Sequence, residues 1–382
     1  MDADPAVGLY IHVPFCRAKC AYCDFNSFAG LESLHGQYAR AVTREVAAAV
    51  PTAWRTIYLG GGTPTVLPLS DLGQLLEAVQ RGRSLAPDPE VSIEANPGTV
   101  DGAGLASLLR LGVNRLSLGI QSFDDAELRL LGRIHTTAEA LEAFRAARRA
   151  GFRNISLDLI FGLPGQSLAS WQASLQRALE LGPEHLSLYA LSVEAGTPLA
   201  GAIARGELAR PDPDLAADMY ELAEEACAAA GYLHYEISNW ARQADLRCEH
   251  NLIYWRNEDY VGLGAGAHSW ARGQRWANVA SPLEYTALLF RGASPIASEE
   301  AIPRELEMGE TMMMGLRLVD EGVSFERFRQ RFGTDLRQKY ASEIEELDRL
   351  DLLEVGADRM RLSPRGRLLA NQVFYRFLPE RA

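Results

Sequence analysis

The most informative stretch of the sequence runs from Leu9 to Cys23 and reads LYIHVPFCRAKCAYC. Its apolar start, residues 9–13, predicts a buried β-strand. Three cysteines follow at once, Cys16, Cys20 and Cys23, with the spacing Cys-x3-Cys-x2-Cys. One loop with this spacing can wrap an iron–sulfur cubane, because each thiolate can take one iron corner. The stretch therefore predicts a strand whose carboxyl end carries a metal centre.

Five more apolar runs alternate with segments of helical periodicity. Together with the first they predict six strands, at residues 9–13, 56–59, 91–95, 115–120, 155–161 and 185–191. Helices are predicted at residues 34–50, 69–81, 102–111, 137–150, 168–181 and 215–230. Alternating strands and helices imply parallel strands joined by crossover helices. We therefore expect an α/β fold, a partial (β/α)6 TIM-like barrel.

Unusual residues lie where five of these strands end. The loops contain the cysteines, Gly60-Gly61-Gly62-Thr63-Pro64, Glu94-Ala95-Asn96-Pro97, Gln121-Ser122 and Gly162-Leu163-Pro164-Gly165. In a barrel, all carboxyl ends of the strands open on one face, where active sites of such folds lie. The sequence therefore predicts one site at this mouth.

The character of the chain changes near residue 301. Helices predicted at residues 305–316, 324–332 and 336–347 lead into a hairpin over residues 352–362, and a last helix follows. We expect a barrel over residues 1–235, a connecting segment over 236–300 and a small winged-helix-like α+β domain over 301–382. Winged helices often bind DNA, but a fold alone does not decide function. The net charge of −12 argues against a nucleic-acid partner.

Composition bounds the remaining classes of protein. No apolar stretch approaches the ~20 residues of a transmembrane helix, and the start Met1-Asp2-Ala3-Asp4-Pro5 has no cationic region before an apolar one. Five cysteines, an odd number, do not make a disulfide framework. We expect a cytoplasmic protein with a metal site and two spare thiols, Cys227 and Cys248.

Zinc is the main alternative to an iron–sulfur cluster at the three cysteines. A site of three thiolates and one histidine is common for zinc, and His12 lies nearby in sequence. Zinc sites, however, favour Cys-x2-4-Cys pairs set well apart. A four-iron cluster normally takes four cysteines. Because the other two lie far away in sequence, an exogenous ligand on the fourth iron is the simpler completion.

The cysteine loop, with Tyr22 directly before the third cysteine, resembles the radical S-adenosylmethionine (SAM) signature. The run from Tyr10 to Cys16 is similar to the branch that contains oxygen-independent coproporphyrinogen III oxidases and the HemW heme chaperones. The resemblance implies a [4Fe–4S] cluster on Cys16, Cys20 and Cys23, with SAM on the fourth iron and an electron donor as partner. In that superfamily an electron from the cluster cleaves SAM to a 5′-deoxyadenosyl radical.

The resemblance also implies a set of SAM-contacting residues. They are Tyr10, Tyr22, Gly61, Gly62, Thr63, Glu94, Gln121, Arg133 and Asp158. Without the family, the glycine run could equally be a tight turn, Gln121 could close a strand, Arg133 could be solvated, and Asp158 could be satisfied by backbone amides.

The segment His250-Asn251-Leu252-Ile253-Tyr254-Trp255 resembles the heme chaperone branch. His250 offers an imidazole that could be an axial ligand of heme iron, with two flat aromatic neighbours for a porphyrin. The alternative is a packed, hydrogen-bonded core histidine.

Two functions then compete. An oxidase would decarboxylate coproporphyrinogen III, whereas a chaperone would bind heme and deliver it to heme-accepting proteins, including a membrane-bound acceptor. The oxidases carry a fourth cysteine two places after the third, where this chain has Phe25, and a long N-terminal extension, where eight residues precede Leu9 here. Both departures favour the chaperone.

Overall fold

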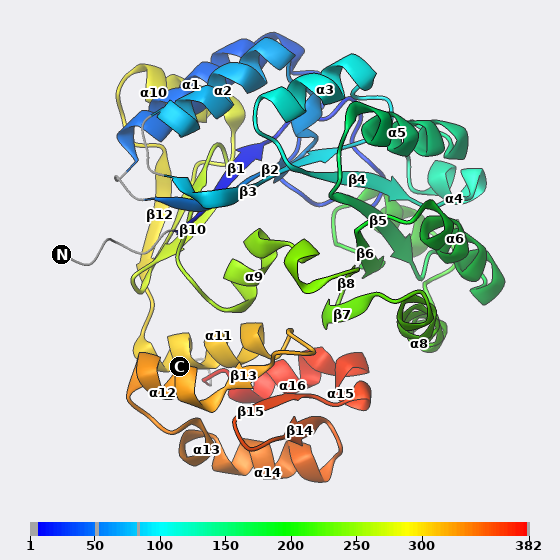
Figure 1. Ribbon diagram of the computed structural model, residues 1–382, viewed down its shortest axis with the longest axis vertical. Helices are drawn as coiled ribbons and strands as arrows, with labels where there is room; N and C mark the ends of the chain where they lie inside the picture. The colour runs from blue at the N-terminus through cyan, green and yellow to red at the C-terminus, as the bar shows by residue number, and fades with distance from the viewer. Residues whose placement is uncertain (1–6, 50–52, 82–84, 380–382) are drawn as a thin grey trace.

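The computed structural model describes residues 7–49, 53–81 and 85–379, and its core is a parallel sheet (Figure 1). All six predicted strands are present and neighbour one another in chain order. They are β1 (Val7–Val13), β2 (Trp54–Gly61), β3 (Leu85–Ala95), β4 (Arg115–Gln121), β5 (Ile155–Phe161) and β6 (His185–Ala190). Their alternate leucines and isoleucines are fully buried under the helices, as in Leu9, Ile57 and Leu157. The other residues of each strand face the inside of the barrel.

The predicted helices cover the outer face of this sheet (Figure 1). They are α1 (His35–Ala48), α2 (Leu69–Arg81), α3 (Gly102–Arg110), α5 (Thr137–Ala150), α6 (Leu168–Leu181) and α8 (Pro213–Ala229). Two short helices, α4 (Asp125–Leu130) and α7 (Pro198–Ala204), were not predicted. Local sequence sets their limits: Thr136 and Glu139 form a capping box at the start of α5, and Gly151 ends it at a φ of 112°. Val50, the predicted end of the first helix, lies outside the described residues, as do residues 1–6 and 380–382.

The predicted connecting segment extends the sheet at both edges. Within the described ranges the strand order is β12-β11-β10-β9-β1-β2-β3-β4-β5-β6-β8-β7. The added strands are β7 (Leu233–Glu236), β8 (Asn239–Ala241), β9 (Tyr260–Leu263), β10 (His268–Ala271), β11 (Gln274–Asn278) and β12 (Ile296–Ala301). They are short, and β12 is exposed throughout, so they carry little of the apolar signal that predicted the core strands. Since β12 and β7 remain edges, the barrel is partial, as predicted.

Two helices of the same segment complete the barrel. The helix α10 (Pro282–Phe290) packs on α1, and α9 (Glu249–Trp255) contacts β2 on one side and the C-terminal domain on the other. In Figure 1, α9 lies between the sheet and the lower domain. The His-Asn-x2-Tyr-Trp segment therefore forms a short helix between the barrel sheet and the C-terminal domain.

The C-terminal domain lies below the barrel and has a core of its own (Figure 1). It consists of α11 (Arg304–Gly315), β13 (Val323–Ser324), α12 (Phe325–Phe332), α13 (Leu336–Lys339), α14 (Ala341–Arg349), β14 (Leu353–Val355), β15 (Arg359–Leu362), α15 (Pro364–Leu368) and α16 (Ala370–Phe377). Helices, a hairpin and a final helix match the predicted order. The helix predicted at residues 336–347 is divided at Tyr340, whose φ of −117° and ψ of 35° are not helical.

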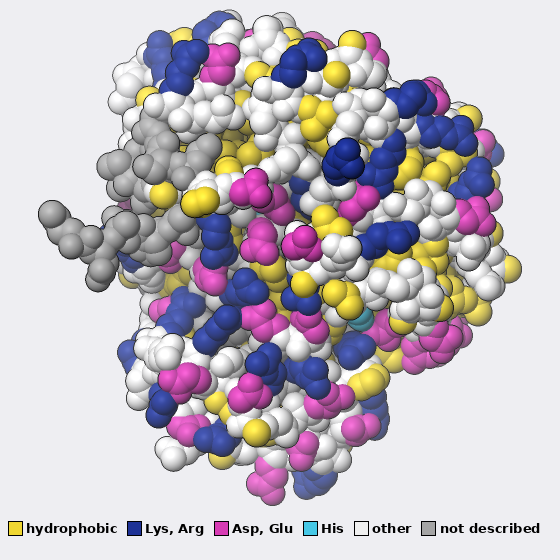
Figure 2. All heavy atoms as spheres, viewed as in Figure 1, with side chains coloured by type: hydrophobic (Ala, Val, Ile, Leu, Met, Phe, Trp, Pro, Cys, Tyr) yellow, Lys and Arg dark blue, Asp and Glu magenta, His cyan; other side chains and the backbone are white. Residues whose placement is uncertain are grey.

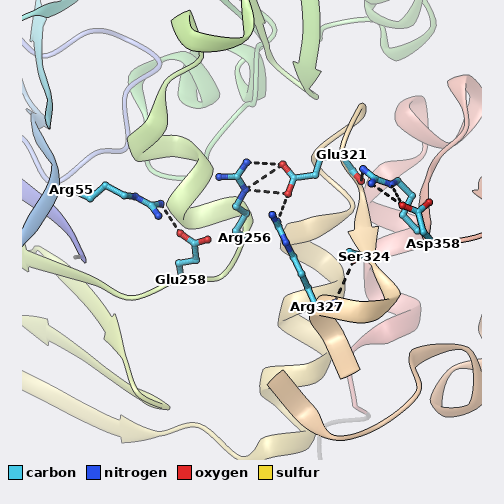
Figure 3. Close-up of polar contacts among 8 residues, drawn as sticks. Arg55, Arg256, Glu258, Glu321, Ser324, Arg327 and Asp358 are labelled. Carbon is cyan, nitrogen blue, oxygen red and sulfur yellow. Dashed lines mark hydrogen bonds and ion pairs between the residues drawn. The ribbon is translucent and has the colours of Figure 1, made fainter. Parts of the chain in front are cut away.

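A charged junction joins the two domains. Glu321 accepts hydrogen bonds from Arg256 of the barrel, 2.7 Å at Nη2, and from Arg327 of the C-terminal domain (Figure 3). To the left of this junction in Figure 3, Arg55 pairs with Glu258 at 2.6 Å. Figure 2 shows basic and acidic side chains interspersed over this part of the surface. Across the described ranges, no helix has the length and apolar character needed to cross a bilayer.

Candidate functional site

A cavity of about 500 Å³ opens where the strands β1 to β6 end, and residues from all the predicted loops but one line it. Eleven of the predicted site residues meet there: Cys16, Cys20, Tyr22, Cys23, Gly61, Gly62, Thr63, Glu94, Gln121, Arg133 and Asp158. These positions span almost 150 residues of chain, so only the fold brings them together. The fifth loop, at Gly162, does not reach the cavity.

The three thiols stand at the mouth on the loop after β1. Backbone bonds hold this loop, with Cys16 N–H donating to Phe28 at 2.9 Å and Ala21 N–H donating to Leu131 at 3.0 Å. The Cys16 Sγ accepts from the Thr63 hydroxyl at 3.7 Å, and Cys20 Sγ accepts from Arg133 Nη1 at 3.4 Å. Burial raises the pKa of the Cys16 thiol, and the bond from Thr63 works against that rise.

The glycine loop after β2 passes very close to the cysteine loop. A Cβ on Gly62 would lie 2.6 Å from the Phe15 carbonyl oxygen, so no larger residue fits without a shift. Gly61 has a φ of 107°, a conformation that favours glycine. Gly62 is thus required by the close approach of two loops, and a Cβ on Gly60 would instead meet the side chains of Tyr58 and Glu94.

Glu94, at the end of β3, is held on both sides. Tyr58 donates to Oε1 at 2.7 Å, and Gly61 N–H donates to Oε2 at 3.2 Å. Burial raises the pKa of Glu94 to about 7, while these hydrogen bonds favour the carboxylate. The group can therefore gain or lose a proton near neutral pH.

Arg133 bridges the cysteine loop and two strand ends. Besides Cys20, its guanidinium donates to the Gly119 carbonyl at 2.6 Å and to the Asn96 side chain. Asn96 in turn donates to Thr63 at 2.8 Å. Arg133 is therefore a positioned cation beside the thiols, and not a solvated helix residue.

Asp158, in the middle of β5, faces the cavity. Ser117 donates to both of its oxygens at 2.9 Å, and Ser156 donates at 3.0 Å. Burial raises its pKa, and the serine bonds oppose this. The partners of the Asp158 carboxylate are therefore serine hydroxyls, and not the backbone amides that the sequence left open as an alternative. Gln121 also lines the cavity, in the left-handed region at a φ of 71°.

Comparisons with known proteins place this site in a family. Residues 10–178 match the radical SAM superfamily, and residues 302–369 match the HemN C-terminal domain. A curated relative, the heme chaperone HemW of Bacillus subtilis (strain 168), is 38% identical over 376 residues, covering 97% of this chain and 99% of that protein. The heme chaperone HemW of Synechocystis is 40% identical over 366 residues, covering 93% and 88%. The chain belongs to the HemW family of radical SAM proteins.

A solved structure supports the fold of this HemW-family chain. Coproporphyrinogen III oxidase (HemN) from Escherichia coli superposes with a TM-score of 0.84, covering 97% of this chain and 90% of that one. Its sequence is 23% identical, so this likeness shows the radical SAM barrel and the C-terminal domain alone.

The thiols fit the cluster that a radical SAM family implies. All three are partly accessible at the cavity mouth, whereas Cys227 and Cys248 are fully buried. A zinc site with His12 does not fit, because both its ring nitrogens are engaged, Nδ1 with the Tyr10 hydroxyl and Nε2 with the Asn26 carbonyl, each at 2.9 Å. In the described part of the chain no three His, Cys, Asp or Glu side chains are arranged around a single metal ion.

Two predicted site residues lie below the cavity. Tyr10 does not line it and bonds His12 instead. His250 is 1% exposed, with Nδ1 at 2.7 Å from the Thr56 hydroxyl and Nε2 at 2.8 Å from the Tyr254 hydroxyl. Burial lowers its pKa to about 3, and the charge of Arg115 adds to this. This geometry matches the core histidine that the sequence left open as an alternative.

Several cavity residues had not been predicted. The most informative are Asn96, Tyr58, Ser117, Arg115 and Asn251. Asn96 stood in a motif already noted at a strand end, and Arg115 is a charge that begins an apolar strand. Both were visible signals, but Tyr58 and Ser117 are ordinary strand residues whose partners come from other strands.

Proposed function

We propose that this chain binds heme and delivers it to heme-accepting proteins, and that it carries a [4Fe–4S] cluster on Cys16, Cys20 and Cys23 with SAM at the fourth iron. The observation that carries the proposal is the convergence of three thiols, a glycine loop, two carboxyls and Arg133 on one cavity. The names of its HemW relatives supply the heme chaperone part.

The residues of the cavity divide the work of holding SAM. We assign the open backbone of Gly61 and Gly62 to the amino acid part of SAM, Thr63 to the positioning of the Cys16 thiol, Arg133 to direct contact with SAM, and Glu94 to hydroxyl groups of the ligand. Gln121, Tyr22 and Asp158 complete the walls. When bound, the cluster supplies an open iron for the amino and carboxylate groups of SAM and one electron, received from a donor protein.

The chaperone is favoured over the oxidase by Phe25. This side chain is 64% exposed at the rim of the cavity, where the oxidases have a further cysteine. Heme ligation by His250 would require both of its hydrogen bonds to open, so we assign this histidine a structural role in the core of the barrel. We place the activity in the cytoplasm, with heme acceptors that include membrane-bound proteins.

The test uses anaerobically reconstituted protein in two arms. In the first arm, heme is added and the Soret band is followed, and an apo-hemoprotein is then supplied as acceptor. In the second, SAM, reductant and coproporphyrinogen III are supplied. We expect saturable heme binding and transfer in the first arm and no protoporphyrinogen in the second. Robust protoporphyrinogen formation, or no heme binding, would contradict the proposal.

A further inference from the structure

The cavity is lined by a buried guanidinium to which no residue of the described ranges forms a hydrogen bond. Arg115 begins β4 and lines the cavity, yet it is only 2% exposed. Its Nε is buried without a hydrogen bond, and no acceptor within the described ranges bonds the rest of the group. A buried charge with unmet donors costs several kcal/mol unless something else satisfies it. Because Arg115 lines the cavity, a ligand bound in the cavity could accept hydrogen bonds from its guanidinium.

The neighbouring carboxyls do not fill this role, because other groups hold them. Glu90 accepts the backbone N–H of Glu249 at 2.9 Å and of His250 at 3.2 Å, and so caps α9. Glu94 is held by Tyr58 and Gly61, and Asp158 by serines, as described above. These three carboxyls attract Arg115 electrostatically but form no hydrogen bond with it.

A second donor that lines this cavity lies on α9. Asn251 lines the same cavity, and no residue in the described ranges hydrogen-bonds its side chain. The preceding residue, His250, does not line the cavity and is buried, with hydrogen bonds to Thr56 and Tyr254. Of the His-Asn pair, it is therefore Asn251 that faces the cavity.

We propose that Arg115 and Asn251 form a carboxylate-binding subsite on the floor of the cavity. A guanidinium presents a planar fork of N–H donors that matches a carboxylate in two parallel hydrogen bonds, and an amide adds a third donor. A phosphate dianion suits the place less well, because Glu94 and Asp158 line the same cavity. The subsite is distinct from the thiols at the mouth and does not depend on heme binding.

The test measures binding of propionate, the simplest such ligand, to the reconstituted holoprotein by saturation-transfer NMR. Propionamide has the same shape without the charge, so it is the matched control ligand. We expect saturable propionate binding, with propionamide at least tenfold weaker. Equal binding of the two ligands, or no saturable binding of propionate, would overturn the subsite.

Variants locate the binding. Arg115→Gln should weaken propionate at least tenfold and Asn251→Ala about threefold, while Arg115→Lys keeps the charge and recovers part of the affinity. Arg177→Gln, on the exposed outer face of α6, is the matched control and should bind as the unmodified chain does. If a folded Arg115→Gln protein binds propionate unchanged, the subsite is wrong. Asn251→Ala tests the same floor from the other element if Arg115→Gln fails to fold.

Competition identifies the source of the natural carboxylate. The propionate titration is repeated with saturating SAM and, separately, with saturating heme. Displacement by heme supports the subsite and indicates a porphyrin propionate, and retention under both ligands supports it and indicates a further carboxylate ligand. Displacement by SAM would overturn the subsite, because the carboxylate of SAM is assigned to the cluster at the thiols, from which the subsite is distinct.

Discussion

Replacing His250 by alanine separates a structural role from heme ligation. The imidazole is fully buried, bonds two hydroxyls, at 2.7 Å and 2.8 Å, and lies against Tyr58 at 5.1 Å between ring centroids. Each lost hydrogen bond costs about 1 kcal/mol net. The space left by the ring costs about 1 kcal/mol more. The free energy of unfolding should therefore fall by about 3 kcal/mol, which lowers Tm by about 6 °C.

Thermal unfolding and heme titration of the same protein make the comparison. We expect His250→Ala to melt early and to bind heme with the Soret maximum of the unmodified chain below its melting temperature. His250→Gln, which can still bond one hydroxyl, should lose about half as much stability. An alanine variant with unchanged Tm and an altered Soret band would refute this reasoning, because it would show an imidazole that is free for iron.

Three further predictions concern the cavity and the domain junction. Burial raises the pKa of Glu94 in the folded chain to about 7. Between the ordinary pKa of a glutamate and pH 7, the folded chain therefore keeps a proton that the unfolded chain has released. The free energy of unfolding should fall as the pH rises through this range. Denaturant titrations at several pH values should show this fall, and Glu94→Gln should reduce it, while the part due to other buried carboxyls such as Asp158 remains; an equal fall in the variant would contradict the assignment. Arg133→Met should keep cluster absorbance and weaken SAM binding at least tenfold by equilibrium dialysis, and unchanged SAM affinity would contradict its place in the site. Glu321→Gln should lower the free energy of unfolding, measured in urea, by about 2 kcal/mol. The control variant Glu326→Gln, whose ion pair is exposed, should lower it by about 0.3 kcal/mol. Equal losses in the two variants would contradict a stabilising role of the Glu321 junction.

The barrel core could be predicted because its signals are local. Each parallel strand is a nearly continuous apolar run, the predicted helices have a clear period, and α3, α5, α6 and α8 begin at a capping side chain. The loops after these strands carried the cysteines, the glycine run and Glu94, and parallel geometry alone brings such loops to one face. This is why the cysteines, the glycine run, Glu94 and Gln121 could be placed at one face, whereas the resemblance to radical SAM proteins was needed to add Tyr22, Arg133 and Asp158 to the site.

What the sequence missed depends on long-range packing. The strands β9 to β12 are short and partly exposed, so their pairing is decided by neighbours and not by their own pattern. The orientation of His250 is set by Thr56 on another strand, which no spacing in the motif reveals. Arg115 and Asn251 become candidate ligand-binding residues only in the folded chain, because β4 and α9, which are far apart in sequence, line the same cavity.

The central claim is that three thiols at the cavity mouth hold a cluster on which SAM binds. Its most direct test is the electron paramagnetic resonance spectrum of the reduced, reconstituted protein, recorded with and without SAM, for the unmodified chain and for Cys→Ala variants. We expect a four-iron signal that changes on addition of SAM, is lost in variants of Cys16, Cys20 or Cys23, and persists in variants of Cys227 and Cys248. A four-iron signal that does not change when SAM is added, or that is still present in the Cys16→Ala variant, would contradict the account.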